Sequence, residues 1–308
     1  MFSSPGNGVA LIGNFVFPIF HVKMTKSGKN SIILYVFLQR RKKICNFAPK
    51  NNPYRIVINF TIITCTYNAS KYIDRTLDSV RGQSYPHIEH FIIDGASKDD
   101  TVKKVQTYAY DSRYPVIVKS EPDNGLYDAM NKGIQLAKGD YIIFLNAGDV
   151  FHEEDTLTCV AEKLKGKELP GVIYGDTDIV DEKGIFIRKR SLSPPETLSW
   201  ESFKEGMLVC HQAFYARTDL AKQVSYNLDY KYSADVDWCI RIMKEAEKQG
   251  LELMNTHKTL CSFLKGGMTT QSHQASLIER FKIMAHHYGA LTTIRQHLWF
   301  VVRAVIKA

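Results

Sequence analysis

The sequence lacks several features that would assign it to a class at once. It has no C-x-x-C pair and no cysteine–histidine spacing typical of a zinc site, so a structural zinc domain is not predicted. No apolar run reaches the ~18 to 20 residues that a membrane-spanning helix needs. The first apolar stretch is neither preceded by positive residues nor followed by a small-residue cleavage site, which argues against a signal peptide. Internal repeats and low-complexity tracts are missing too, which excludes a solenoid.

Acidic residues are absent from residues 1–55, which contain nine Lys or Arg. The whole chain carries a net charge of +8, so the rest of it is close to neutral. The basicity therefore belongs to this N-terminal segment, and nucleic acid is not a predicted partner. We interpret residues 1–55 as a poorly ordered extension, or as the result of a start codon placed too far upstream. A basic tether to a membrane surface is the alternative.

What is present is the composition of an ordinary globular protein. The 308 residues are 44% hydrophobic and 23% charged, enough for one large or two modest domains with a sizeable core. Several of the six cysteines fall in apolar strand or helix patterns, which favours buried free thiols in a reducing compartment. The predicted location is the cytoplasm.

The first half of the chain alternates between strand and helix patterns. Strands are predicted at residues 60–66, 88–94, 116–118 and 141–145, with helices near 73–80, 99–110 and 126–137 between them. Such alternation indicates right-handed β-α-β units, so the fold class is α/β with a mostly parallel sheet flanked by helices.

The second half has a less regular pattern. Helices are predicted near 153–165 and from about 234 to 249, with short strands at 172–174, 184–188, 212–216 and within 251–263. The tail, residues 276–308, is predicted to form two helices. The second helix has an apolar stripe widened by Trp299 and bordered by Arg295, Arg303 and Lys307. Such a helix suits a membrane interface, or packs on the domain or on a second subunit of a homodimer.

Polar side chains follow four of the predicted strands at their carboxyl ends. They lie at residues 66–68, at Asp94, at 121–125 and at 146–149. In open α/β sheets this edge is where ligands bind, so these groups are expected to line one site. Asp149, on a short glycine-containing turn, suits a hard cation that is also bound by the phosphates of a nucleotide. An ordinary turn followed by a helix cap is the alternative for this stretch.

Four motifs together resemble the family 2 glycosyltransferases, and among them the bacterial enzymes that extend exopolysaccharide or capsule units. They are TYNASKYIDRTLDSVRGQSY (66–85), IIDGASKDDT (92–101), EPDNGLYDAMNKGIQLAKGDYIIFLNAGD (121–149) and YGD (174–176). The resemblance covers residues 60–267. It implies the GT-A fold in one domain over residues 56–270, and the apolar pattern of the tail predicts amphipathic C-terminal helices over 271–308.

The resemblance also implies an activity. The family carries out inverting transfer from a nucleotide-diphosphate sugar, most commonly a UDP-sugar, with Mg²⁺ or Mn²⁺ as the cofactor. The implied acceptor is a glycan or a lipid-linked sugar, which places the enzyme at the inner face of the cell membrane as a peripheral protein.

Carried over by position, the resemblance assigns roles to individual residues. The base and ribose would be held by Thr66, Tyr67, Asn68 and Asp94, with Ser97 nearby. The ribose and diphosphate would be flanked by Asp123 and Lys132, and the donor or acceptor would be contacted by Asn146 and His211. The metal ligand would be Asp149. One departure from the family pattern stands out. The first acid of the metal motif would fall at Ala147, so only one carboxylate remains, and its affinity for a cation depends on the substrate phosphates.

The catalytic base is expected from the second half. The segment ADVDW (234–238) opens a helix and resembles the acidic pair of the family with its first acid replaced, which puts Asp235 at the position of the base. An acceptor hydroxyl must lose its proton as it attacks the anomeric carbon, and a carboxylate is suited to take it. The alternative is that Asp235 only caps the helix.

Two other functions are weighed against transfer. A catalytically inactive protein of the same fold that binds nucleotide sugar or acts as a scaffold would explain the shortened metal motif, but both Asp149 and Asp235 are retained. A nucleotidyltransferase would need a glycine-rich, basic phosphate loop after the first strand, and residues 67–70 read YNAS.

Overall fold

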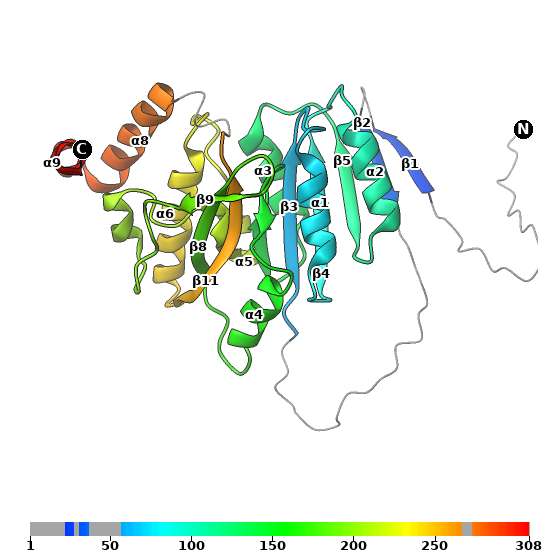
Figure 1. Ribbon diagram of the computed structural model, residues 1–308, viewed down its shortest axis with the longest axis horizontal. Helices are drawn as coiled ribbons and strands as arrows, with labels where there is room; N and C mark the ends of the chain where they lie inside the picture. The colour runs from blue at the N-terminus through cyan, green and yellow to red at the C-terminus, as the bar shows by residue number, and fades with distance from the viewer. Residues whose placement is uncertain (1–21, 28–30, 37–56, 267–272, 308) are drawn as a thin grey trace, which may run out of the picture.

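Strand β3 (Phe60–Thr66) lies near the middle of the sheet and is buried along its whole length. Phe60 and Ile62 belong to one hydrophobic cluster, whereas Ile63 and Cys65 belong to another. Because successive side chains of a strand point to opposite faces, this strand must lie between two covered faces. The computed structural model shows this arrangement, with helices on both sides of one large sheet (Figure 1).

The structure describes residues 22–27, 31–36, 57–266 and 273–307. In the first half of this part, strands and helices alternate as predicted. They are β3, α1 (Ile73–Gly82), β4 (Ile88–Asp94), α2 (Thr101–Asp111), β5 (Val116–Ser120), α3 (Leu126–Leu136) and β6 (Tyr141–Phe144). The order β5-β4-β3-β6 is parallel throughout, which confirms the predicted α/β class and the parallel sheet.

The second half continues the same sheet in mixed directions. Its elements are β7 (Val150–Phe151), α4 (Thr156–Lys163), β8 (Val172–Val180), β9 (Phe186–Lys189), the 3-10 turns η1 (Trp200–Glu205) and η2 (His211–Ala213), β10 (Phe214–Arg217), α5 (Thr218–Gln223), α6 (Ala234–Lys248) and β11 (Leu253–Leu264). Strand β10 pairs antiparallel with both β6 and β8, and so joins the two halves. Strand β8 extends well beyond the predicted 172–174 because β11 pairs with it along most of its length.

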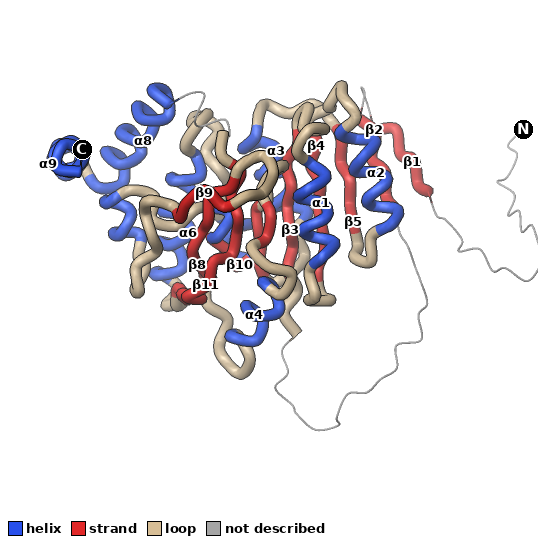
Figure 2. Tube along the Cα trace, in the orientation of Figure 1, coloured by secondary structure: helices blue, strands red, loops and turns tan. Residues whose placement is uncertain are grey.

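Two sets of helices cover the two faces of the sheet. Helices α3, α5 and α6 pack in the cluster built around Trp238, Phe144 and Phe214, whose rings meet edge to face. Helices α1, α2 and α4 cover the opposite face, as Figure 2 shows for α1 and α2. Each of the two larger hydrophobic clusters contains residues of both halves, so the two halves pack together.

Two strands lie inside the segment that the sequence predicts to be a poorly ordered extension. Strands β1 (Val22–Ser27) and β2 (Ser31–Val36) form an antiparallel pair, and β2 pairs with β5. The reason is that β5 would otherwise leave the N–H and C=O groups of a sheet edge unpaired. The other residues of 1–55 lie outside the described part of the chain.

The tail forms the two predicted helices, α8 (His273–Tyr288) and α9 (Ala290–Lys307). Helix α8 lies against α6, to which His287 and Ser276 are hydrogen bonded. Helix α9 lies at the opposite side of the molecule from β1 (Figure 1). Among the described residues, no helix has both the length and the apolar character needed to cross a membrane.

Candidate active site

The first part of the site is the edge formed by the carboxyl ends of β5, β4 and β3. The register aligns Thr66 with Asp94 and Asp94 with Ser120 across these strands. Asp94 is 1% exposed and accepts four hydrogen bonds, from the Thr66 and Ser97 hydroxyls (2.9 and 2.5 Å) and from the Ser97 N–H and Ser120 hydroxyl (2.9 and 2.7 Å). Its carboxylate therefore organises three segments of the edge around one point.

The loop after β3 is fixed to the same point. The Ser97 hydroxyl accepts a hydrogen bond from the Asn68 N–H at 2.8 Å, and the Asn68 side chain accepts one from the Lys98 N–H at 2.9 Å. Asn68 and Ala96 have φ angles of 47° and 61°, which side-chain-bearing residues seldom adopt and which these bonds hold in place. Tyr67, which directly precedes Asn68, is 63% exposed.

Asp123 lies close against the turn that follows β4. A Cβ atom on Gly95 would come within 2.6 Å of the Asp123 carboxylate, so only glycine permits this approach. Lys132, by contrast, forms ion pairs with two acidic residues, since its Nζ atom lies 3.2 Å from Glu121 and 3.4 Å from Asp128. The structure thus brings Asp123 to the edge with Asp94, while it holds Lys132 in an ion-pair network.

Asp149 is 4% exposed and connects three segments. One carboxylate oxygen accepts a hydrogen bond from the Gln212 side chain at 2.7 Å, and the other accepts one from the Leu264 N–H at 3.0 Å. Burial raises the pKa of Asp149 to about 6, against the opposing effect of these donors. The carboxylate therefore links the end of β6 to the η2 turn and to the end of β11.

The η2 turn reaches both acidic residues through consecutive side chains. Gln212 binds Asp149, and the Nδ1 atom of His211 lies 3.6 Å from an Asp235 oxygen. The Nε2 atom of His211 accepts from the Asn146 amide at 3.4 Å. The His211 ring therefore lies between Asn146 and Asp235.

Asp235 is the second residue of α6, and Ser233 holds the N-cap position. Its side chain turns back toward the sheet, where the Tyr127 hydroxyl donates a long hydrogen bond of 3.4 Å to it. Burial alone would raise the pKa of Asp235, but the hydrogen bond and charge of His211, together with Arg280, outweigh it and lower the pKa. Asp235 is therefore charged at neutral pH, and the N-cap position that was the alternative for it is held by Ser233.

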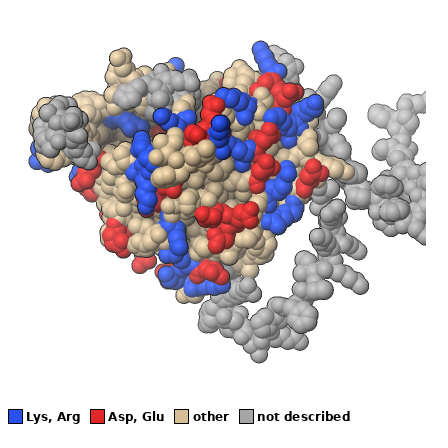
Figure 3. All heavy atoms as spheres, in the orientation of Figure 1, with Lys and Arg blue, Asp and Glu red and all other residues tan. Residues whose placement is uncertain are grey.

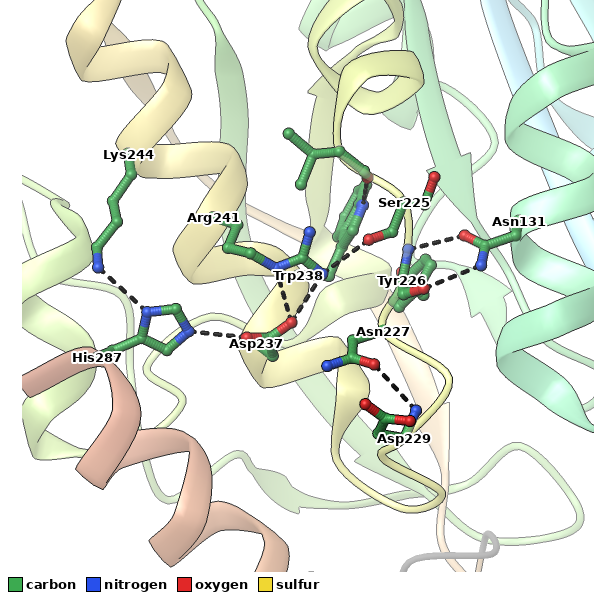
Figure 4. A network of polar contacts seen from close by, with 11 residues as sticks. Asn131, Ser225, Tyr226, Asn227, Asp229, Asp237, Trp238, Arg241, Lys244 and His287 are labelled. Carbon is green, nitrogen blue, oxygen red and sulfur yellow. Dashed lines mark hydrogen bonds and ion pairs between the residues drawn. The ribbon is translucent and has the colours of Figure 1, made fainter.

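The neighbouring acid, Asp237, serves another purpose. It is 3% exposed and accepts hydrogen bonds from Arg241 at 2.7 Å and from His287 at 2.8 Å, as Figure 4 shows. Burial opposes its charge, but these two partners lower the pKa of Asp237. Both oxygens of Asp237 accept hydrogen bonds, so this residue links α6 to α8 and is not available to a substrate.

The residues expected to hold a divalent cation supply some of the ligands that such an ion needs, but not a complete set. The described residues contain no group of three or more His, Cys, Asp or Glu side chains arranged to bind a metal. However, the side-chain oxygen of Asn146 is buried and has no hydrogen-bond partner, three residues before Asp149. An amide oxygen and one carboxylate make a small hard-ligand set, which phosphate oxygens of a substrate would complete.

A groove of about 810 Å³ also lies between α4 and β11, lined by residues including His152, Lys163 and Lys258. None of the predicted site residues lines it. The chemistry points instead to the sheet edge, where the carboxylates are buried and oriented.

Sequence reasoning did not single out Tyr127, and it did not predict the contacts of Gln212 and His287 with acidic residues. Gln212 follows His211 directly, so the adjacent pair was a signal, but which acid each side chain binds depends on the η2 turn. Tyr127 and His287 carry no motif, because they reach α6 from other helices.

A parallel half of the sheet joined to a mixed half, with acidic residues at the junction, is the arrangement of the GT-A fold. A model of the family described as "Glycosyl transferase family 2" matches residues 61–223, and the chain belongs to this family. The protein is therefore a glycosyltransferase, as the motifs indicated.

Individual relatives agree with this assignment. The chain is 32% identical over 183 residues to a PGL/p-HBAD biosynthesis glycosyltransferase of Mycobacterium bovis, covering 59% of this chain and 68% of that protein. It is 29% identical over 217 residues to the amylovoran biosynthesis glycosyltransferase AmsB of Erwinia amylovora, covering 67% and 69%.

Solved structures share the fold. One is TarS of S. aureus in complex with UDP-GlcNAc, with a TM-score of 0.60 and 19% identity over 74% of this chain and 64% of that chain. Another is the mannosyltransferase PcManGT of Pyrobaculum calidifontis with GDP-Man and Mn²⁺, with a TM-score of 0.52 and 16% identity over 80% and 77%.

Proposed function

We propose that this glycosyltransferase moves a sugar from a UDP-sugar to a glycan or lipid-linked acceptor in bacterial polysaccharide synthesis, with inversion at the anomeric carbon. The observation that carries the proposal is the placement of Asp235, a half-buried carboxylate with a lowered pKa, beside His211 at the carboxyl edge of the sheet. The names of the relatives, which refer to glycolipid and exopolysaccharide biosynthesis, support the acceptor class.

In the proposed reaction, Asp235 accepts the proton of the acceptor hydroxyl. The acceptor oxygen forms a bond to the anomeric carbon while the bond from that carbon to the diphosphate oxygen breaks, so UDP leaves with the electron pair. Attack from the side opposite the leaving group inverts the configuration in one displacement. His211 and Tyr127 orient the Asp235 carboxylate for this step.

The donor is proposed to lie across the edge formed by β5, β4 and β3. Tyr67 stacks on the base, while the groups anchored by Asp94, among them Thr66, Asn68 and Ser97, shape the pocket for base and ribose. Asp123 faces the ribose and diphosphate, and Lys132 lies along them within its ion pairs to Glu121 and Asp128. Asn146 and Asp149 would hold Mg²⁺ or Mn²⁺ together with the diphosphate, and the ion would neutralise charge on the leaving group.

A donor panel tests this function. Nucleotide release would be measured with UDP-, GDP- and dTDP-sugars, with and without EDTA. We expect turnover with a UDP-sugar and a loss of turnover when EDTA removes the divalent ion, restored by Mn²⁺. Turnover with GDP- or dTDP-sugars alone would contradict the proposed base, and full turnover in EDTA would contradict the proposed cofactor.

We also propose that the enzyme works at the inner face of the cell membrane as a cytoplasmic, peripheral protein. Helix α9 leaves a row of apolar side chains exposed, with Leu291 at 85%, Leu298 at 63% and Trp299 at 52%. Residues 271–308 contain five Lys or Arg and one Glu, a balance that favours an anionic lipid surface.

Vesicle sedimentation tests the membrane proposal. The parent should pellet with vesicles that contain anionic lipid and less with neutral vesicles, and replacing Leu298 and Trp299 with Ser should abolish the difference. If the same double variant instead turns a dimer into a monomer in light scattering, and vesicle binding is unchanged, this face is the interface of a homodimer.

A further inference from the structure

Helix α6 carries Asp235, yet the backbone leading into it is held by another helix. Its N-cap residue, Ser233, makes no capping hydrogen bond through its side chain. Instead, the Glu279 carboxylate of α8 accepts hydrogen bonds from three consecutive N–H groups, those of Lys231 and Tyr232 at 2.8 Å each and of Ser233 at 3.0 Å. One side chain from the tail thus fixes the whole approach to α6.

Further contacts join the same two helices on both sides of Asp235. The hydroxyls of Ser233 and Ser276, which are 0% and 2% exposed, lie 2.9 Å apart. Beyond Asp235, His287 binds Asp237 at 2.8 Å, and both of these side chains are only 4% exposed. Figure 4 shows the second contact, with His287 reaching from α8 toward Asp237 on α6. Helix α8 is therefore hydrogen bonded to the start of α6 on both sides of Asp235 in the sequence.

Glu279 constrains the orientation of the start of α6 more than the contact between Ser233 and Ser276 does. Hydrogen bonds to a charged carboxylate are shorter and roughly twice as strong as neutral ones. Three of them, all to one loop, leave residues 231–233 without freedom to rotate. A negative charge at the N-terminus of α6 is also favoured by the dipole of the helix. Without Glu279, the first turn of α6 could shift, and Asp235 would shift with it relative to His211 and Tyr127.

We propose that Glu279 is a positioning residue of the transfer reaction, and that α8 is part of the catalytic unit instead of an appended tail. This inference rests on the proposed role of Asp235 as the base. Glu279 touches neither donor nor acceptor in this account. It acts through the backbone of residues 231–233, which sets where the Asp235 carboxylate points.

The test compares Glu279→Gln with Lys282→Gln, a change of charge at an exposed position of the same helix. The Gln variant keeps the size of the side chain but turns an N–H group toward backbone donors. Because a displacement of about 1 Å at a reacting group can cost 10²-fold in rate, we expect kcat to fall about 10- to 100-fold. The KM for the donor and the Kd for UDP should stay within twofold, since the donor edge is built from other elements. Lys282→Gln should match the parent.

Two results would overturn the inference. One is a kcat equal to that of the parent in Glu279→Gln. The other is a fall in kcat that appears only together with weaker UDP binding and a lower melting temperature, as general loss of structure produces. If Glu279→Gln does not fold, Glu279→Asp, which keeps the charge but is one methylene shorter, is measured by the same criteria. Asp235→Asn separates the two proposals, because activity in that variant refutes the base itself, whatever Glu279 does.

Discussion

Asp235→Asn is expected to lose sugar transfer by a factor of about 10²–10⁴, the usual contribution of a general base. Asparagine keeps the shape of the side chain and can still accept from Tyr127, but it cannot take the proton of the acceptor hydroxyl. Donor binding should be unchanged, because the base and ribose are proposed to be held at the edge around Asp94. Transfer would be measured as product formation, and UDP binding by calorimetry.

A nearby control strengthens this test. Asp229→Asn removes a carboxylate from the exposed loop that precedes α6 and should leave the rate unchanged. Transfer at the parental rate by Asp235→Asn would show that another group accepts the proton.

The pH dependence of the parent follows from the same geometry. Since the pKa of Asp235 is lowered, the carboxylate stays charged at neutral pH, and kcat should fall only when the pH drops below the usual range for an aspartate. The Asn variant should have no such acidic limb.

Asp149→Ala is expected to weaken both the fold and the metal-dependent binding of nucleotide. The change leaves the Gln212 amide and the Leu264 N–H without their acceptor in a buried place, at a cost of about 1–3 kcal/mol for each donor. Urea unfolding should therefore show a loss of a few kcal/mol. Calorimetry with UDP should show that Mn²⁺ no longer strengthens binding.

The two effects of Asp149 can be separated with matched variants. Gln212→Ala removes one of the internal donors but keeps the carboxylate, so it should affect stability less and leave the effect of Mn²⁺. Asp78→Ala, at a surface position on α1 with a 67% exposed side chain, should change neither property. If UDP and Mn²⁺ bind Asp149→Ala as they bind the parent, Asp149 is an internal linker only.

The distribution of charge over the surface can be compared with the sequence. On the face shown in Figure 3, acidic and basic side chains are intermixed over the body of the protein, with no broad patch of one sign. This agrees with the sequence, in which the excess of positive charge lies in residues 1–55.

Much of the fold could be predicted from local pattern. The apolar strands from Phe60 to Phe144 and the helices between them follow from side-chain periodicity, which depends on neighbouring residues alone. The length of β8 and the antiparallel direction of β10 could not be predicted, because they depend on pairing between segments far apart in the chain. The hairpin of β1 and β2 was missed for the same reason, since it is stabilised by the free edge of β5.

In the candidate site, too, some features follow from local sequence and others depend on contacts between distant segments. By itself the sequence determined the family, the α/β class, and the acids at the strand and helix ends, because the motifs and their spacing are properties of the chain. Only the tertiary structure decided what each acid does. Asp94 and Asp149 have their oxygens bound by protein donors, Asp237 is fastened to His287, and Asp235 is left facing His211. Hydrogen-bond partners come from elements that are distant in sequence, so the fold determines which donors surround each carboxylate.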